Sequence, residues 1–241
     1  MTAENWGPRN WGNDRLSDFL RQAEQNKWAV YERHQSLWQA SVEIELLYQR
    51  VFEGLAYPSN QTSVALFARS VPIWRQSLSM AMSGAFMEAY TLLRLTLEFS
   101  IYAAFLELAP DKVRTWANRD DDLECLKQVR NTFKITEMTS IIGDNIGLKL
   151  RNGIRELYDK AITFGAHPNV AGVLVSSAII TDGETKTLGM IGLHHDLDLI
   201  KAVINDVNLA ARLGLRCVKG CYKTRLRLAG VEDELEALVG A

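Results

Sequence analysis

Residues 86–108 of this chain read FMEAYTLLRLTLEFSIYAAFLEL, and this stretch is apolar on nearly every side of a helical projection. A helix of that kind has to be packed by neighbours on several sides. Its length also matches a membrane span of about 20 residues. However, Arg94 and Glu98 lie in its middle, and each central charge costs roughly 2.5–3.5 kcal/mol on insertion scales. The stretch therefore predicts a buried central helix of a soluble protein.

The remaining sequence predicts further helices around this one, so we expect a mainly α, multi-helix protein. Only five of the 241 residues are Pro, and apolar side chains recur at spacings of three and four along most of the chain. Pro72 predicts a kink or a break near Val71. The expected helices cover residues 14–55, with Asn13 or Asp14 as the cap, 62–82, 86–108, 111–118, 121–133, 136–142 and 148–164, followed by a long helix from His194 or Asp196 to about Arg227.

Two segments depart from the helical pattern. Residues 1–12 repeat the triplet Asn-Trp-Gly around a Pro, which predicts an irregular N-terminal arm, and the aromatic Trp6 and Trp11 need a place to dock. Residues 173–191 hold β-forming runs on either side of an Asp-Gly turn signal, which predicts a small β-hairpin insertion. We therefore expect an arm over residues 1–12 and a single helical domain over residues 13–241.

Composition and motif searches narrow the possible functions. Lys and Arg number 27 against 29 Asp and Glu, so the net charge of −2 gives no support for RNA binding or a membrane surface. Phosphate-loop, dinucleotide-binding, zinc-protease and nucleophile-elbow motifs are absent. The start of the chain lacks the order of a signal peptide, and the odd number of three cysteines favours reduced thiols. We expect a cytoplasmic protein without cofactor or metal.

Arg94 and Glu98 are the first candidate site residues. They are four residues apart, so they share one face of the central helix. Charges on so apolar a helix have to pair, because an unpaired buried charge is very costly. One interpretation is an internal ion pair that fixes helix packing, and the other is a polar cleft between helices. Arg94 carries more hydrogen-bond donors than one carboxylate can accept, so we expect Tyr158, His167 and Asn169 to lie nearby.

The histidines and the remaining cysteines give weaker signals. His167 precedes a Pro just after a predicted helix, where it either caps a carbonyl or acts as an acid or base near neutral pH. His194 and His195 point apart on a helix, so we interpret the segment as a helix start with Asp196. Cys217 and Cys221 have no evident third ligand, which favours core thiols over a metal site.

Residues 86–98 also carry a family resemblance. The run Phe86-Met87-Glu88-Ala89-Tyr90-Thr91-Leu92-Leu93-Arg94-Leu95-Thr96-Leu97-Glu98, with Tyr158 and His167-Pro168-Asn169 further on, resembles a group of prokaryotic helical proteins. That group looks like distant members of the HEPN class, the higher eukaryotes and prokaryotes nucleotide-binding helical domain. The resemblance implies an up-and-down helical bundle that is often dimeric. Some members are RNases, which use an Arg followed by a His after four to six intervening residues.

This chain departs from the active members, because none of its four histidines has an Arg at that upstream distance. The resemblance therefore implies Arg94, Glu98 and His167 as candidate residues of a polar site. It does not imply the RNase mechanism of the active members. Two functions stay open. One is a non-catalytic module that forms a homodimer or binds a protein partner. The alternative is a divergent RNase or RNA-binding protein of a toxin–antitoxin or phage-defence type, with His167 as acid or base and Arg94 on a phosphate.

Overall fold

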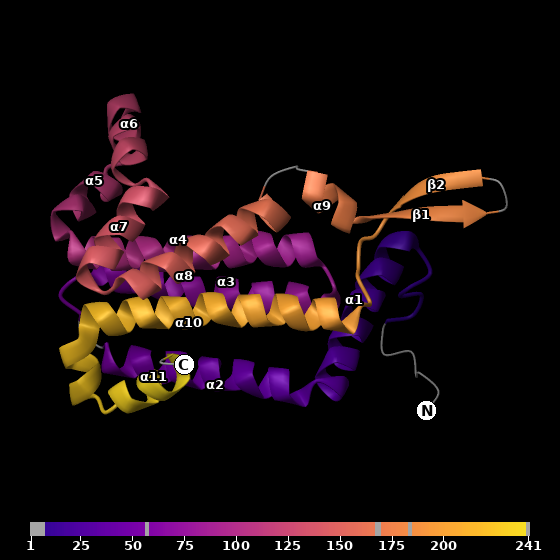
Figure 1. Cartoon of the computed structure of the whole chain (residues 1–241), viewed down its shortest axis with the longest axis horizontal. Coiled ribbons are helices and arrows are strands. Elements are labelled where there is room, and N and C mark those ends of the chain that lie inside the picture. Colours follow the sequence, from indigo (N-terminus) through magenta and orange to yellow (C-terminus); the bar gives the residue numbers. More distant parts are fainter. Residues whose placement is uncertain (1–7, 56–57, 167–169, 183–184, 240–241) are drawn as a thin grey trace.

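A computed structural model describes residues 8–55, 58–166, 170–182 and 185–239 of the chain, and in those ranges it is a helical bundle with one small hairpin. This confirms the predicted fold class (Figure 1). The long helices are α1 (Arg15–Arg33), α2 (Gln35–Gly54), α3 (Gln61–Ser83), α4 (Phe86–Leu108), α8 (Leu148–Ala161) and α10 (Leu197–Leu228). The shorter elements are η1 (Pro110–Lys112), α5 (Val113–Ala117), α6 (Leu123–Thr132), α7 (Ile135–Asn145), the π-helical η2 (Ile162–Ala166), α9 (Val170–Val175), β1 (Ser177–Asp182), β2 (Thr185–Met190) and α11 (Glu232–Val239).

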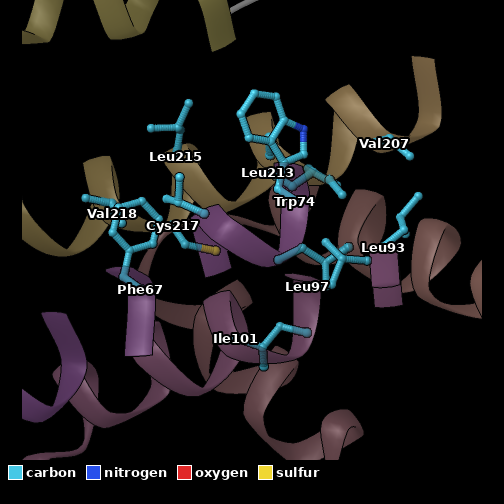
Figure 2. Packing of buried hydrophobic residues seen from close by; sticks show 14 of the residues in the cluster. Phe67, Trp74, Leu93, Leu97, Ile101, Val207, Leu213, Leu215, Cys217 and Val218 are labelled. Atoms are coloured by element: carbon cyan, nitrogen blue, oxygen red, sulfur yellow. The ribbon is translucent and has the colours of Figure 1, made fainter. Parts of the chain in front are cut away.

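Helix α4 is the centre of the bundle, as its sequence predicts. It packs against α3, α10, α7, α8 and η2, and the side chains of Leu93, Leu97 and Ile101 are fully buried (Figure 2). Among the described residues, α4 is the single helix long and apolar enough to cross a membrane. However, 61% of its most apolar window is buried inside the protein, as in the core helix of a soluble protein.

The first long helix differs from the prediction, because it is broken at His34 into α1 and α2. His34 has φ −132° and ψ 49°, which is not helical, and its carbonyl accepts from the first turn of α2. The break lets the two halves pack on different partners. In α1, Asn26 Nδ2 donates to the Ser83 carbonyl at the end of α3, at 2.8 Å. In α2, Ser41 forms a buried hydrogen bond with Asn208 of α10.

Helix α3 continues through Pro72, so of the two predicted outcomes at this position the break does not occur. Pro72 cannot donate to a carbonyl in the preceding turn. The carbonyl that loses this donor is that of Ala68, four residues earlier, whereas the buried Ser70 hydroxyl bonds the neighbouring Phe67 carbonyl at 2.7 Å. The extensive packing of α3 on α4 holds the helix in one piece.

The hairpin is present but starts later than predicted. Residues 173–175 belong to helix α9 and not to a strand, and the paired strands cover 177–182 and 185–190. β1 and β2 are antiparallel, with Ile179 opposite Leu188 and Ser177 opposite Met190. In Figure 1, α9 and the hairpin project beyond the bundle at the end where α1 lies. From here on, the arm means α9, β1 and β2, and not the predicted N-terminal arm of residues 1–12.

Candidate functional site

The predicted polar cluster forms at the contact between α4 and α8. Arg94 Nε lies 3.2 Å from Glu98 Oε1, and the Tyr158 hydroxyl donates to the same oxygen at 2.9 Å. The Arg94 and Glu98 side chains are 28% and 24% exposed, so the pair is half-buried. The structure therefore brings together three of the five predicted site residues. The other two, His167 and Asn169, lie outside the described residues.

The state of Tyr158 limits the chemistry of this cluster. Burial, followed by the negative charge of Glu98, raises the pKa of the Tyr158 hydroxyl well above its usual range. Tyr158 is therefore a protonated donor at neutral pH and not a base. The Tyr158 hydroxyl and the Arg94 guanidinium both contact the Glu98 carboxylate. Arg94 and Glu98 pair within α4, and the hydrogen bond from Tyr158 joins α8 to this pair.

A small pocket adjoins Glu98 on its other side. It has a volume of about 230 Å³ and is lined mainly by apolar and aromatic side chains, with Glu98 and Arg119 as its charges: Leu66, Leu95, Glu98, Phe99, Tyr102, Trp116 and Arg119. Burial and then the charge of Glu98 raise the pKa of the Tyr102 hydroxyl. The side chains therefore offer a hydroxyl donor, one guanidinium and one carboxylate. Neither a second carboxylate nor a histidine of the described residues lines this pocket.

The Arg94–Glu98 pair gives a first testable prediction. We expect Arg94→Ala to lower the free energy of unfolding by about 1–2 kcal/mol, which is more than an exposed pair contributes and less than the 3–5 kcal/mol of a fully buried one. The reason is that Glu98 keeps only the Tyr158 donor while remaining mostly shielded from water. Urea unfolding followed by circular dichroism measures the change.

The matched control is Lys127→Ala, which removes the exposed Lys127–Glu124 pair of α6, where the side chains are 69% and 80% exposed. The free energy of unfolding of Lys127→Ala is expected to differ little from that of the wild type. Replacing Arg94 and Glu98 together by Leu should cost less than Arg94→Ala, because no unpaired charge remains. An Arg94→Ala protein as stable as Lys127→Ala would show that the pair is solvated.

The other candidates from the sequence have structural roles. The Asp196 side chain caps α10 by accepting from the backbone of Asp198 and Leu199. His194 stacks on Phe86, with ring centroids 4.5 Å apart, and burial lowers its pKa. Cys217 is buried, and burial raises the pKa of its thiol to about 12, so it is an unreactive core group. No group of His, Cys, Asp and Glu in the described ranges could hold a metal ion.

A larger surface feature lies elsewhere, in an apolar groove between α1, α2 and α3. The groove has a volume of about 570 Å³. Buried side chains of α3, including Trp74, Leu78 and Met82, line part of it. The other lining residues come from all three helices: Glu24, Lys27, Trp28, Tyr31, Trp38, Ser41, Val42, Glu45, Leu46, Arg75 and Ser79. We call this feature the aromatic groove.

Large apolar side chains on α1 and α2 stay open to solvent at the aromatic groove. The exposed fractions are 54% for Trp28, 45% for Tyr31, 38% for Trp38 and 53% for Leu46. Tyr31 and Trp38 meet edge to face across the break at His34, with centroids 5.5 Å apart. At the rim, Arg75 pairs with Glu45, and its hydrogen bond lowers the pKa of that carboxyl. The charges are therefore paired with each other, and the exposed surface of the groove is mainly apolar.

Sequence reasoning did not predict the aromatic groove. Trp28, Tyr31 and Trp38 belong to the apolar stripe of the predicted helix 14–55, and periodicity alone does not distinguish an exposed face from a buried one. The available signal was its composition, since the stripe holds two Trp and one Tyr within eleven residues. Aromatic residues of this kind are enriched at binding surfaces. The comparisons with protein families, with characterised proteins and with solved structures find no match for this chain.

Proposed function

We propose that this chain is a non-catalytic binding module that works as a homodimer, with the aromatic groove as part of the contact. The observation that carries the proposal is the set of exposed Trp28, Tyr31, Trp38 and Leu46 side chains around one groove. The largest apolar patches of soluble monomers are often functional, and aromatic residues dominate the energy of protein contacts. A cytoplasmic location and an additional protein partner are compatible with this function.

The alternative, a divergent HEPN-like RNase or RNA-binding protein, has less support. A site for phosphate chemistry needs a cation that is free to bind the phosphate. Arg94 instead pairs with Glu98, and Glu98 also accepts from Tyr158. The overall charge of −2 provides no general attraction for RNA. The HEPN resemblance of residues 86–98 stays a prediction, and its dimeric members agree with the proposed homodimer.

The oligomeric state tests the proposed function. We expect sedimentation equilibrium at micromolar concentration to give twice the 27.1 kDa mass of one chain. Leu46→Glu should raise the dissociation constant at least tenfold, because burying an unpaired carboxylate costs more than about 1.4 kcal/mol. The matched control is Leu123→Glu on α6, where the wild-type side chain is 84% exposed and far from the groove in the fold. A monomeric wild-type protein, or equal effects of the two changes, would contradict the proposal.

A further inference from the structure

The arm presents a second apolar surface that the bundle does not cover. Ile179 and Leu188 are directly opposite each other in the hairpin, and Met190 lies on the same face because side chains alternate along a strand. Their exposed fractions are 72%, 67% and 70%. Val170, Val173 and Leu174 of α9 are at least half exposed as well. An isolated two-stranded hairpin is marginally stable in water, so this apolar face needs a cover.

The base of the arm is fixed to the bundle, which gives the exposed face a defined position. Ser176, between α9 and β1, hydrogen-bonds Met87 of α4, and its carbonyl accepts from Ile191 at 2.7 Å. After β2, the Gly192 backbone lies against the Phe19 ring of α1. The arm therefore projects from the same end of the molecule that carries α1 (Figure 1).

From the two unpartnered apolar surfaces we infer that the arm of each protomer packs in the aromatic groove of a second copy of this chain. The inference rests on the proposed homodimer and names its contact. It requires a two-fold dimer in which each chain gives its arm and receives its partner's, so that both surfaces of both chains are covered. Such an isologous arrangement closes and does not continue into a filament.

The areas fit this arrangement. The six exposed apolar side chains of the arm present on the order of 700 Å² and the four around the groove on the order of 400 Å², whereas a stable interface takes about 800 Å² from each partner. The arm alone falls short of that area, and so does the groove alone. Together they exceed it. The arm projects from the bundle, so it is free to reach a hollowed surface such as the groove on another molecule.

The charges at the two surfaces do not oppose the contact. The rim of the groove pairs Glu45 with Arg75 and Glu24 with Lys27, so no uncompensated like charges meet the arm there. On the apolar face of the hairpin, Lys186 lies beyond Ile179 and Leu188 and is exposed. An apolar sheet face bordered by a charge at its outer end can enter an apolar groove and leave the charge in water.

A mixing experiment tests the exchange of arms. The arm variant carries Ile179→Thr and Leu188→Thr, which keep β-forming residues in the strands while removing apolar surface. The groove variant carries Leu46→Glu. We expect each variant alone to dimerise at least tenfold more weakly than wild type, measured by sedimentation with one fluorescently labelled protomer. An equimolar mixture of the two should associate at least tenfold more tightly than either alone, because one arm–groove contact of the mixed dimer is unaltered.

Direct groove–groove and arm–arm contacts predict the opposite result, since every contact of the mixed dimer would then contain an altered side. Leu228→Thr, at an 81% exposed position of α10, is the control for loss of a surface leucine. If the mixture is no tighter than the variants, or if the arm variant dimerises like wild type, the exchange is wrong and the homodimer stands. If wild type is monomeric, both proposals are wrong. If a monomer binds phosphatidylglycerol vesicles through the arm, the apolar face of the arm contacts a membrane and not a second copy of the chain.

Discussion

Gly84→Ala is expected to lower the free energy of unfolding by about 3 kcal/mol or more, since a left-handed non-glycine residue costs about 1–2 kcal/mol and overpacking about 1–3 kcal/mol. Gly84 ends α3 with φ +87°, and its N–H donates to the Ala81 carbonyl. A Cβ at this position would lie 2.8 Å from the His194 backbone nitrogen, with the His194 carbonyl oxygen closer still. Backbone atoms cannot rotate away as a side chain can, so the segment before α10 would have to move.

The Gly84 backbone also forms part of the joint that would be displaced. Its carbonyl accepts from the His194 N–H at 2.9 Å, which ties the turn between α3 and α4 to the entry of α10. Chemical unfolding followed by far-ultraviolet circular dichroism gives the change in stability. Loss of this joint should also loosen the base of the arm, because His194 follows β2 after only three residues.

Gly230→Ala is the matched control for this prediction. Gly230 also has a left-handed backbone, with φ +68°, but a Cβ there would meet nothing within 4 Å. Only the conformational cost of a left-handed non-glycine residue remains, about 1–2 kcal/mol. The difference between the two variants therefore measures the close approach of Gly84 to His194. Equal losses of stability would mean that the two backbones do not meet in solution.

The second large effect is expected at Gly165, in the π-helical turn η2. A Cβ on Gly165 would lie 2.6 Å from the Met87 carbonyl oxygen, 2.6 Å from the Thr91 backbone nitrogen and 2.6 Å from the Tyr90 Cβ. All three atoms belong to the first turns of α4. The Thr91 hydroxyl donates to the Gly165 carbonyl at 2.6 Å, so this close contact is also hydrogen-bonded. Gly165→Ala should therefore lower the free energy of unfolding by about 2–3 kcal/mol.

Gly153→Ala on α8 is the control for Gly165→Ala, because it makes the same Gly-to-Ala change in a helix without a close backbone contact. The nearest atom to a Cβ at Gly153 is Leu213 Cδ2 at 3.3 Å, the tip of a flexible side chain. Ala is favoured over Gly inside a helix by about 1 kcal/mol, so this control should be neutral or stabilising. The same unfolding measurement applies to both variants. A Gly165→Ala protein as stable as Gly153→Ala would show that η2 does not pack directly on α4.

Several parts of the fold follow from sequence because they depend on neighbours along the chain. Helix α4 forms over residues 86–108 as predicted and most of its apolar side chains are buried, because a helix that is apolar on nearly every side packs against several neighbours. Asp14 and Asp196 cap their helices because a carboxylate can accept from the free N–H groups two and three residues later. Arg94 and Glu98 pair because residues four apart share a helix face.

Other parts depend on neighbours that are distant in sequence, and there the sequence predictions fell short. Nothing in the residues around His34 requires a helix break, and the break follows from α1 packing on α3 while α2 packs on α10. The run Val173-Leu174-Val175 favours a strand, yet it forms helix α9, because only residues from Ser177 onward have a partner strand. Strand formation needs a partner, and local preference does not supply one.

The two surfaces used in the proposals show the same division. The sequence by itself predicted Trp28, Tyr31 and Trp38 as one apolar stripe of a continuous helix, because helical periodicity places residues on faces. The break at His34 puts Trp38 on a second helix, and the packing of α1 and α2 brings the three side chains to one groove. Periodicity does not say whether another element covers a face. Only the tertiary structure decided that α3 supplies the floor of the groove and leaves its opening to solvent, since burial is a property of the packed elements together.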